Sequence, residues 1–252
     1  DNLNARIQLH ARFSLSTIPW QRWIFDHIDW RSDSRVLELG CGPGTLWLEN
    51  RDRVPAGVRL VLSDFSPGML DTARRNLTDF PRSLSFEMVD AQAIPFDAGQ
   101  FDIVMAHHML YHVPDRAKAL REIRRVLKPG GMVYASTVGE NHLRELWELV
   151  EIFAPGTLAS TRGVSQGFTL ENGAAQLARW FDDVRVHYYE DGLVVTEAEP
   201  LIAYVRSSLT LMSHAAAFSA ERQAAFADEV KRRIANEGAI RVTKASGLFV
   251  AV

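Results

Sequence analysis

The sequence predicts an α/β fold, in which a mostly parallel sheet is covered by helices on both faces. Three observations support this prediction: strand-like and helix-like segments alternate, a glycine-spaced turn follows the first strand, and two later strands end in an aspartate. Such alternation requires crossover connections, and ligands then bind at the carboxyl ends of the parallel strands. The functional residues are therefore expected just after the strands.

The first predicted strand ends in a turn that contains Gly40, Gly42 and Gly44. Because glycine has no Cβ, the chain can bend sharply there and bring its backbone close to a ligand. A helix can begin at Thr45, and its free N–H groups would point toward the same place. Ordinary turns between a strand and a helix also use glycine, so this segment alone does not establish a ligand site.

Further strands and helices follow in alternation. A short apolar strand over 58–63 precedes a helix that begins at Ser66 and Pro67, where a hydroxyl can cap the first turn. Another helix begins after Pro114, has apolar residues at helical spacing and ends before the turn at 128–131. The remaining predicted strands of this part are 85–89, 101–106 and 132–137.

Two carboxylates are expected at the same edge of the sheet as the glycine turn, because Asp64 closes the second strand and Asp90 the third. A carboxylate after the second strand can accept hydrogen bonds from both hydroxyls of a ribose. One after the third strand can accept from the adenine amino group, while the amide of Ala91 donates to a ring nitrogen. Each aspartate could instead cap a turn. Together with the glycine turn they indicate an adenosine ligand.

Five motifs occur in a fixed order: Leu37-Glu38-Leu39-Gly40-Cys41-Gly42-Pro43-Gly44, Ser63-Asp64-Phe65-Ser66-Pro67-Gly68-Met69-Leu70, Asp90-Ala91 before Ile94-Pro95-Phe96, Phe101-Asp102-Ile103-Val104, and Val126-Leu127-Lys128-Pro129-Gly130-Gly131. Their order and spacing resemble the class I S-adenosylmethionine-dependent methyltransferases, specifically the small-molecule branch that includes ubiquinone and menaquinone methyltransferases. The resemblance covers about residues 35 to 138. It implies a Rossmann-like three-layer sandwich with a seven-stranded, mostly parallel sheet, in which 184–189 and 248–252 supply the last two strands and the last strand is antiparallel.

The resemblance implies the cofactor S-adenosylmethionine, with S-adenosylhomocysteine as the product. The residues that it assigns to the cofactor are Glu38, which would orient the turn from beneath, Gly40, Cys41, Gly42 and Gly44 beside the methionine part, Asp64 on the ribose, Asp90 and Ala91 on the adenine, Phe65 and Met69 in apolar contact with the adenine, and His107 near the amino group. A nicotinamide-dependent dehydrogenase fits less well, because Thr45 stands where its fingerprint has the third glycine. Cys41 lies just before a predicted helix, and the start of a helix can lower the pKa of a thiol. Cys41 could instead be present only because a tight turn needs a small residue.

The sulfonium methyl group is already activated, so the protein mainly has to position the acceptor and exclude water. A base would help if the acceptor is an oxygen or an acidic carbon, and the candidates His108, Tyr111 and His112 follow the fourth strand. These side chains could also simply pack around the pocket. We expect no metal, since no further ligands accompany the two histidines. The segment also lacks the Asn/Asp-Pro-Pro-aromatic sequence of enzymes that methylate exocyclic amines of nucleic-acid bases.

We predict a single methyltransferase domain over residues 1–252, with its core at 35–138 and a lid formed by an N-terminal helical segment, 1–30, and an insertion, 139–182. Amphipathic helices are predicted over 18–28 and 143–153, a loop over 155–167, and two further helices around Leu201 and Phe226. The apolar content of 47%, the charge of −3 and the single cysteine favour a cytoplasmic protein. No apolar run is long enough for a membrane span, and no export signal is found.

We expect methyl transfer to a small, partly apolar or aromatic molecule, without a nucleic-acid or membrane partner. Two alternatives stay open. The chain could bind S-adenosylmethionine without catalysis, or it could methylate a protein or an RNA.

Overall fold

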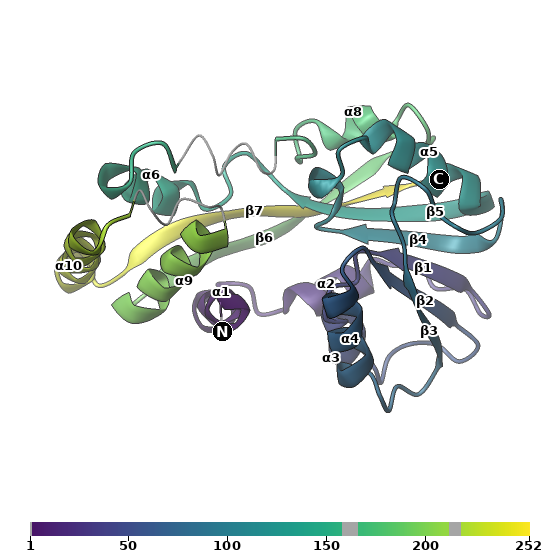
Figure 1. Ribbon diagram of the computed structural model, residues 1–252, viewed down its shortest axis with the longest axis horizontal. Coiled ribbons are helices and arrows are strands. Elements are labelled where there is room, and N and C mark those ends of the chain that lie inside the picture. The colour runs from purple at the N-terminus through teal and green to yellow at the C-terminus, as the bar shows by residue number, and fades with distance from the viewer. Residues whose placement is uncertain (1, 158–165, 212–217) are drawn as a thin grey trace. The chain divides into compact units, whose positions relative to one another are not determined.

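The computed structural model describes residues 2–157, 166–211 and 218–252, which form two compact units (Figure 1). Unit 1 consists of Asp1–Pro19, Gly139–Gln166 and Glu190–Ala245, and unit 2 of Trp20–Val138, Gly167–Tyr189 and Ser246–Val252. Each unit has a hydrophobic core of its own. The unit boundaries cut through both segments of the predicted lid, 1–30 and 139–182. The single domain and the lid stay predictions.

A seven-stranded sheet has the order β3-β2-β1-β4-β5-β7-β6. Its strands are β1 Arg35–Leu39, β2 Arg59–Asp64, β3 Ser83–Met88, β4 Phe101–His107, β5 Leu127–Val138, β6 Arg185–Val195 and β7 Ile240–Ala251. The first five strands pair in parallel, whereas β7 is antiparallel to β5. The predicted fold class, including the antiparallel last strand, is confirmed. The strand order reverses between β1 and β4, and ligands of such sheets bind at this point.

Helices cover both faces of the sheet in unit 2 (Figure 1). One face carries α2 Trp20–Asp26, α3 Thr45–Glu49 and α4 Pro67–Asn76, and the other carries α5 Arg116–Val126 and α8 Gly173–Leu177. Alternate residues of β4 serve the two faces: Ile103 and Met105 belong to one hydrophobic cluster, Val104 and Ala106 to the other. A strand buried on both faces has to be apolar throughout, which explains the continuous apolar run of β4.

Short polar contacts set the beginnings of the helices after β2 and β4. The Ser66 side chain accepts a hydrogen bond from the amide of Met69 at the start of α4, and Asp115 accepts one from the amide of Lys118 at the start of α5. The sequence predicted the Ser66 cap, and for α5 it predicted a start after Pro114 without naming a cap. The last strands are longer than predicted, because β6 and β7 include residues that belong to unit 1.

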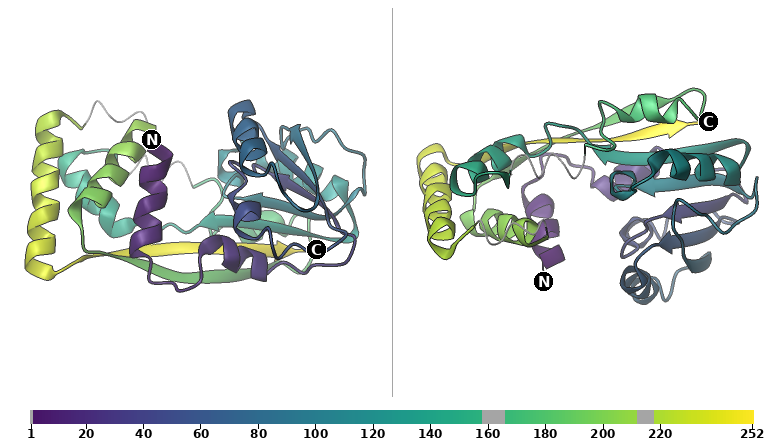
Figure 2. Two further views of the ribbon diagram at one scale, coloured as in Figure 1. Left: turned by 90° about the horizontal axis from the view of Figure 1, so that it is seen from below. Right: turned by 45° about the horizontal axis from the view of Figure 1, so that its top comes forward.

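Among the described residues of unit 1, four helices surround its hydrophobic core: α1 Asn2–Phe13, α6 Arg144–Phe153, α9 Ala198–Leu211 and α10 Ala220–Glu237. Helix α1 packs beside α9, and α10 packs against α6 and α9 (Figure 2). The sequence predicted α6, α9 and α10, and it placed a helical segment over 1–30, which includes α1. Residues 158–165 of the predicted loop and Met212 of the predicted third helix lie outside the described residues.

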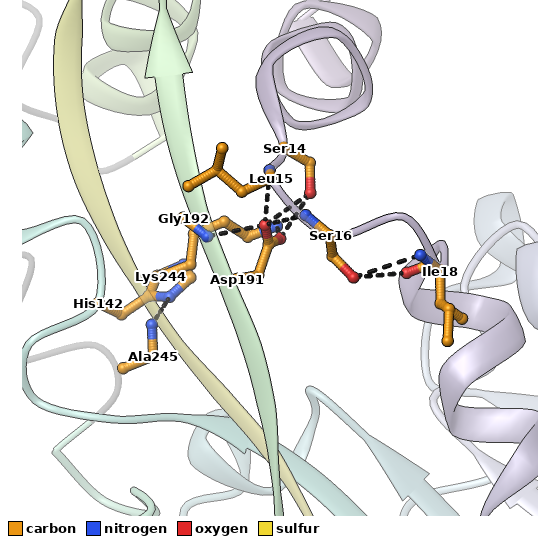
Figure 3. A network of polar contacts seen from close by, with 9 residues as sticks. All are labelled: Ser14, Leu15, Ser16, Ile18, His142, Asp191, Gly192, Lys244 and Ala245. Carbon is orange, nitrogen blue, oxygen red and sulfur yellow. Dashed lines mark hydrogen bonds and ion pairs between the residues drawn. The ribbon is translucent and has the colours of Figure 1, made fainter.

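A buried carboxylate of β6 holds the chain that follows α1 (Figure 3). Asp191 accepts hydrogen bonds from Ser14 Oγ at 2.7 Å and from the amides of Leu15 and Ser16 at 3.0 Å. Lys244 of β7 forms an ion pair with it, and the Asp191 side chain is 0% exposed. This network, which we call the Asp191 network, connects three distant segments of unit 1. In the described part of the chain, no helix has the combined length and apolar character needed to cross a membrane.

Candidate active site

The three glycines of the turn after β1 all have positive φ: 69° at Gly40, 54° at Gly42 and 77° at Gly44. A residue with a side chain is strained in this conformation. A Cβ at Gly40 would lie 2.9 Å from Met109 Cβ, and one at Gly44 would lie 2.8 Å from Leu77 Cδ1. A Cβ at Gly42 would meet no atom within 4 Å. Two glycines therefore allow close packing, and Gly42 presents bare backbone to open space.

Asp64 connects this turn to α4. One carboxylate oxygen accepts a hydrogen bond from the amide of Gly42 at 2.9 Å, and the other accepts one from the amide of Ser66 at 2.8 Å. The amide of Cys41 also donates to the backbone oxygen of Ser63, at 2.8 Å. Because each carboxylate oxygen can accept a second hydrogen bond, Asp64 keeps capacity for two hydroxyl donors.

Glu38 lies buried in β1, two residues before the turn, with 3% of its surface exposed. Its Oε2 accepts a hydrogen bond of 2.5 Å from the indole Nε1 of Trp47 in α3. Burial raises the pKa of Glu38 to about 7, the Trp47 hydrogen bond opposes this rise, and the negative charge of Asp64 adds to it. The side chain therefore links β1 to α3, and its role in orienting the turn stays a prediction.

Cys41 is buried within the turn. Burial raises the pKa of its thiol, and the negative charges of Glu38 and Asp64 raise it further. The sequence left open a lowered thiol pKa at the helix entrance, and the structure contradicts that interpretation. A raised thiol pKa keeps Cys41 in its thiol form at neutral pH, and the thiol is a weaker nucleophile than the thiolate.

Asp90 and Ala91 follow β3. Asp90 Oδ1 accepts hydrogen bonds from the amide of Gln92 at 2.8 Å and from its side chain at 3.1 Å, so the turn-capping interpretation is correct for this residue. A capping carboxylate can still accept from a ligand, because its second oxygen has spare capacity. Two apolar side chains lie after β2: Phe65 is 74% exposed and Met69 is 39% exposed. An aromatic ring exposed to this degree is available for contact with a ligand.

His107, the last residue of β4, has both ring nitrogens buried, and neither has a hydrogen-bond partner among the described residues. Burial lowers its pKa to about 3, and the neighbouring His108 lowers it further. The ring is therefore neutral at physiological pH. Buried unpaired nitrogens are rare in folded proteins and often mark functional positions.

The three candidate catalytic residues follow directly. His108 has a φ of 49°, which is unusual outside glycine, and its amide donates to the backbone oxygen of Ser136 at 3.0 Å. The short helix η1 Leu110–His112 places the rings of Tyr111 and His112 4.5 Å apart. Burial lowers the pKa of His112. Strained residues that cluster after a strand are typical of functional sites.

Trp20 of α2 contacts the ring of His108, and it also contacts one further ring from α2 and one from β6. The centroid of Trp20 lies 5.2 Å from that of His108, 5.3 Å from that of Trp23 and 5.1 Å from that of Tyr189. We call these four residues the aromatic cluster. Trp20 and Trp23 belonged to a predicted helix with a possible substrate role, but Tyr189 was not singled out. Its only signal was a place at the end of a predicted strand.

The structure thus assembles the predicted residues at one edge of the sheet. Residues of the candidate cofactor site follow β1, β2 and β3, and the candidate catalytic residues follow β4. Within the described ranges, no group of three or more His, Cys, Asp or Glu side chains could hold a metal ion.

Residues 37–135 match a family model described as "Methyltransferase domain". The chain is 35% identical over 116 residues to a ubiquinone/menaquinone biosynthesis C-methyltransferase UbiE of a Geobacter species, which covers 45% of this chain and 49% of the relative. It is 32% identical over 120 residues to the ubiquinone biosynthesis O-methyltransferase of Stutzerimonas stutzeri, covering 47% of this chain and 50% of the relative. The chain spans about half the length of the curated relatives that it matches.

Two solved structures show the same fold. The YcgJ protein from Bacillus subtilis has a TM-score of 0.62 at 18% identity. The match covers 92% of this chain and 96% of the YcgJ chain. Phosphoethanolamine N-methyltransferase 2 of Haemonchus contortus, solved with S-adenosyl-L-methionine, has a TM-score of 0.61 at 18% identity and covers 99% of this chain and 56% of its own. The family resemblance inferred from the sequence is confirmed, and the matched segment lies entirely in unit 2.

Proposed function

We propose that this protein transfers a methyl group from S-adenosylmethionine to a small, partly apolar or aromatic molecule, because residues 37–135 match the methyltransferase domain model. The observation that carries the proposal is the turn after β1. Gly42 combines a positive φ, open space where a Cβ would be, and an amide held by Asp64. This arrangement suits a ligand that lies against the backbone and extends toward the carboxylate.

The donor groups around the turn fit the cofactor. Asp64 retains acceptor capacity for the ribose hydroxyls, Asp90 and the amide of Ala91 can pair with the adenine, and the exposed Phe65 ring can cover it. Met69 adds apolar contact. The residues that would shape the turn around the methionine part are Glu38, Gly40, Cys41, Gly44 and the backbone of His107. When bound, the cofactor supplies an activated methyl group.

The aromatic cluster supports an aromatic or apolar acceptor. Trp20 lies against His108, which follows the strand at the switch point of the sheet, and Trp23 and Tyr189 pack against Trp20. Planar ligands pack favourably on such rings, and packing there would orient the acceptor and exclude water. The lowered pKa of His112 keeps its ring unprotonated at neutral pH, so it can accept a proton from an acidic acceptor.

Calorimetric titration with S-adenosylmethionine and S-adenosylhomocysteine tests the cofactor assignment. The Asp64→Ala protein should lose roughly 30- to 800-fold in affinity, about 2 to 4 kcal/mol, because charge-assisted hydrogen bonds are lost. The control is Asp71→Ala, which removes an exposed carboxylate of α4 paired with Arg74 and should bind normally. Unchanged affinity of the Asp64 variant would remove that assignment.

A screen of acceptors with labelled cofactor then tests transfer. Label should pass to phenolic or other aromatic small molecules. Tight cofactor binding without transfer to any acceptor would favour a binding protein without catalysis. Label in protein or RNA fractions would favour the macromolecular alternative.

A further inference from the structure

Two carboxylates lie close together beneath the glycine turn. Glu38 of β1 is buried, and Asp64 ends the neighbouring strand β2, whose Leu62 pairs with Glu38 in the sheet. The groups that face Glu38 are the neutral indole of Trp47 from α3, the thiol of Cys41 from the turn and the carboxylate of Asp64. Among the described residues, no cation acts on Glu38.

The positive charge of Arg74 in α4 does not compensate for the negative charges of these two carboxylates. Arg74 acts on Cys41, but it forms its ion pair with Asp71 on the surface of α4. A buried carboxyl group that faces only neutral and negative groups favours its protonated form. Its pKa is accordingly raised to about 7. A positive charge that arrives at the turn would reverse this preference.

The two ligands proposed for this site differ by one such charge. S-adenosylmethionine carries a positive sulfonium, whereas the sulfur of S-adenosylhomocysteine is uncharged. We propose that Glu38 distinguishes the methyl donor from its product by this charge, ionising when the donor binds and remaining protonated when the product binds. The released proton goes to solvent, and no other bond changes. This inference rests on the proposed function of the same site.

The proposal has a defined pH dependence. Above its pKa Glu38 is already ionised and attracts the donor, whereas below its pKa the donor must first displace a proton. The preference for donor over product should therefore rise by up to about tenfold between about pH 6 and pH 8, and then level off. Methyl transfer removes the positive charge, so that Glu38 then favours release of the product.

Calorimetry in buffers of different ionisation enthalpy measures the proton directly. Near pH 7 the wild-type chain should release up to about half a proton more with S-adenosylmethionine than with S-adenosylhomocysteine. The α-amino groups of the ligands titrate in a similar range, at about 7.7 to 8.0 for an ordinary α-amino group. The Glu38→Gln variant measures the protons that come from these α-amino groups alone. Its side chain can still accept the hydrogen bond from Trp47, but it cannot ionise.

A matched control is Glu49→Gln, which removes a partly buried acid from α3, the helix that carries Trp47. This variant should keep the difference between the two ligands, and Glu38→Gln should abolish it. Infrared difference spectra of the wild-type protein give a second measurement that needs no variant. The band of a protonated buried carboxyl group should disappear with S-adenosylmethionine and persist with S-adenosylhomocysteine.

The outcomes separate the two proposals. If neither ligand binds, the proposed function fails. If both bind with equal proton release, if Glu38→Gln keeps the difference, or if the infrared band does not respond, the role of Glu38 is overturned while the proposed function stands.

Discussion

Gly42 and Gly99 have the same kind of backbone conformation in different places. Their φ angles are 54° and 67°, and a Cβ on either would meet no atom within 4 Å. Gly42 lies in the turn after β1, whereas Gly99 lies in the turn that precedes β4, at the opposite end of the parallel strands. Comparing the two separates backbone strain from ligand contact.

We predict that Gly42→Ala and Gly99→Ala each lower the free energy of unfolding by about 1 to 2 kcal/mol, since both place a side chain at positive φ. Only Gly42→Ala should weaken S-adenosylmethionine binding, because its methyl group enters the space that the ligand would use. Urea denaturation and calorimetry measure the two effects. Equal affinities of the two variants would show that no ligand approaches Gly42.

Glu38 makes stability depend on pH. Its pKa rises from 4.5 to about 7 on folding, so the folded chain binds more protons than the unfolded chain between these values. Stability should therefore fall as pH rises from about 4.5 to about 7 and be constant outside that range, as far as this group is concerned. The shift corresponds to a loss on the order of 3 kcal/mol.

Glu38→Gln should remove this contribution, so that the variant gains stability relative to the wild type as pH rises through the same range. Denaturation curves of both proteins at several pH values measure the difference. A difference independent of pH would mean that Glu38 ionises normally in the folded chain.

For single residues, most of the predictions followed from the residue type alone. Gly40, Gly42 and Gly44 were predictable because only glycine suits their conformations, and Asp64 because it ends a strand. The contacts of Trp20 with His108 and with Tyr189 were not predictable, because they join α2, β6 and the end of β4, which are far apart in sequence. The sequence does not reveal that Gly42 faces open space while Gly40 and Gly44 are closely packed, because this difference depends on their neighbours in the folded chain.

Among the secondary-structure elements, β6 and β7 depart most from the sequence prediction. The sequence indicated 184–189 and 248–252, whereas the strands cover Arg185–Val195 and Ile240–Ala251. The missing parts contain Asp191 and Lys244, charged residues that local patterns assign to solvent. They are buried here because they pair with each other and with the chain after α1. Such compensation depends on tertiary partners.

Asp191→Ala should destabilise the protein by about 3 to 5 kcal/mol, because it breaks the buried ion pair with Lys244 and removes the acceptor of three amides. The control is Arg185→Ala, which breaks an exposed ion pair with Asp183 and should change stability little. Thermal and urea denaturation measure both. Equal small losses would mean that the Asp191 network does not stabilise unit 1.

At the scale of the whole chain, the two units have separate hydrophobic cores and differ in how far they match known proteins. The family match lies in unit 2, and unit 1 combines three segments outside it. Its helices α6, α9 and α10 were predictable from their apolar periodicity. The packing of these helices together with α1 was not predictable, because the three segments of unit 1 are separated in the sequence by segments of unit 2.

Phe226 is fully buried in the core of unit 1. Phe226→Ala should lower the free energy of unfolding by about 3 to 5 kcal/mol, and the milder Phe226→Leu by less. Neither should change the affinity for S-adenosylmethionine, since every residue assigned to the cofactor lies in unit 2. Calorimetry on the folded variant tests this. Weaker binding would show that unit 1 contributes to the cofactor site.

The Asp191 network also constrains the order of events during translation. Ser14 and Asp191 are 177 positions apart, so the ribosome needs about 9 to 35 s at roughly 5 to 20 residues per second to deliver the acceptor. Lys244 emerges later still. Throughout that interval the nascent segment after α1 lacks its anchor, and unit 1 can close only after translation has passed the end of β6.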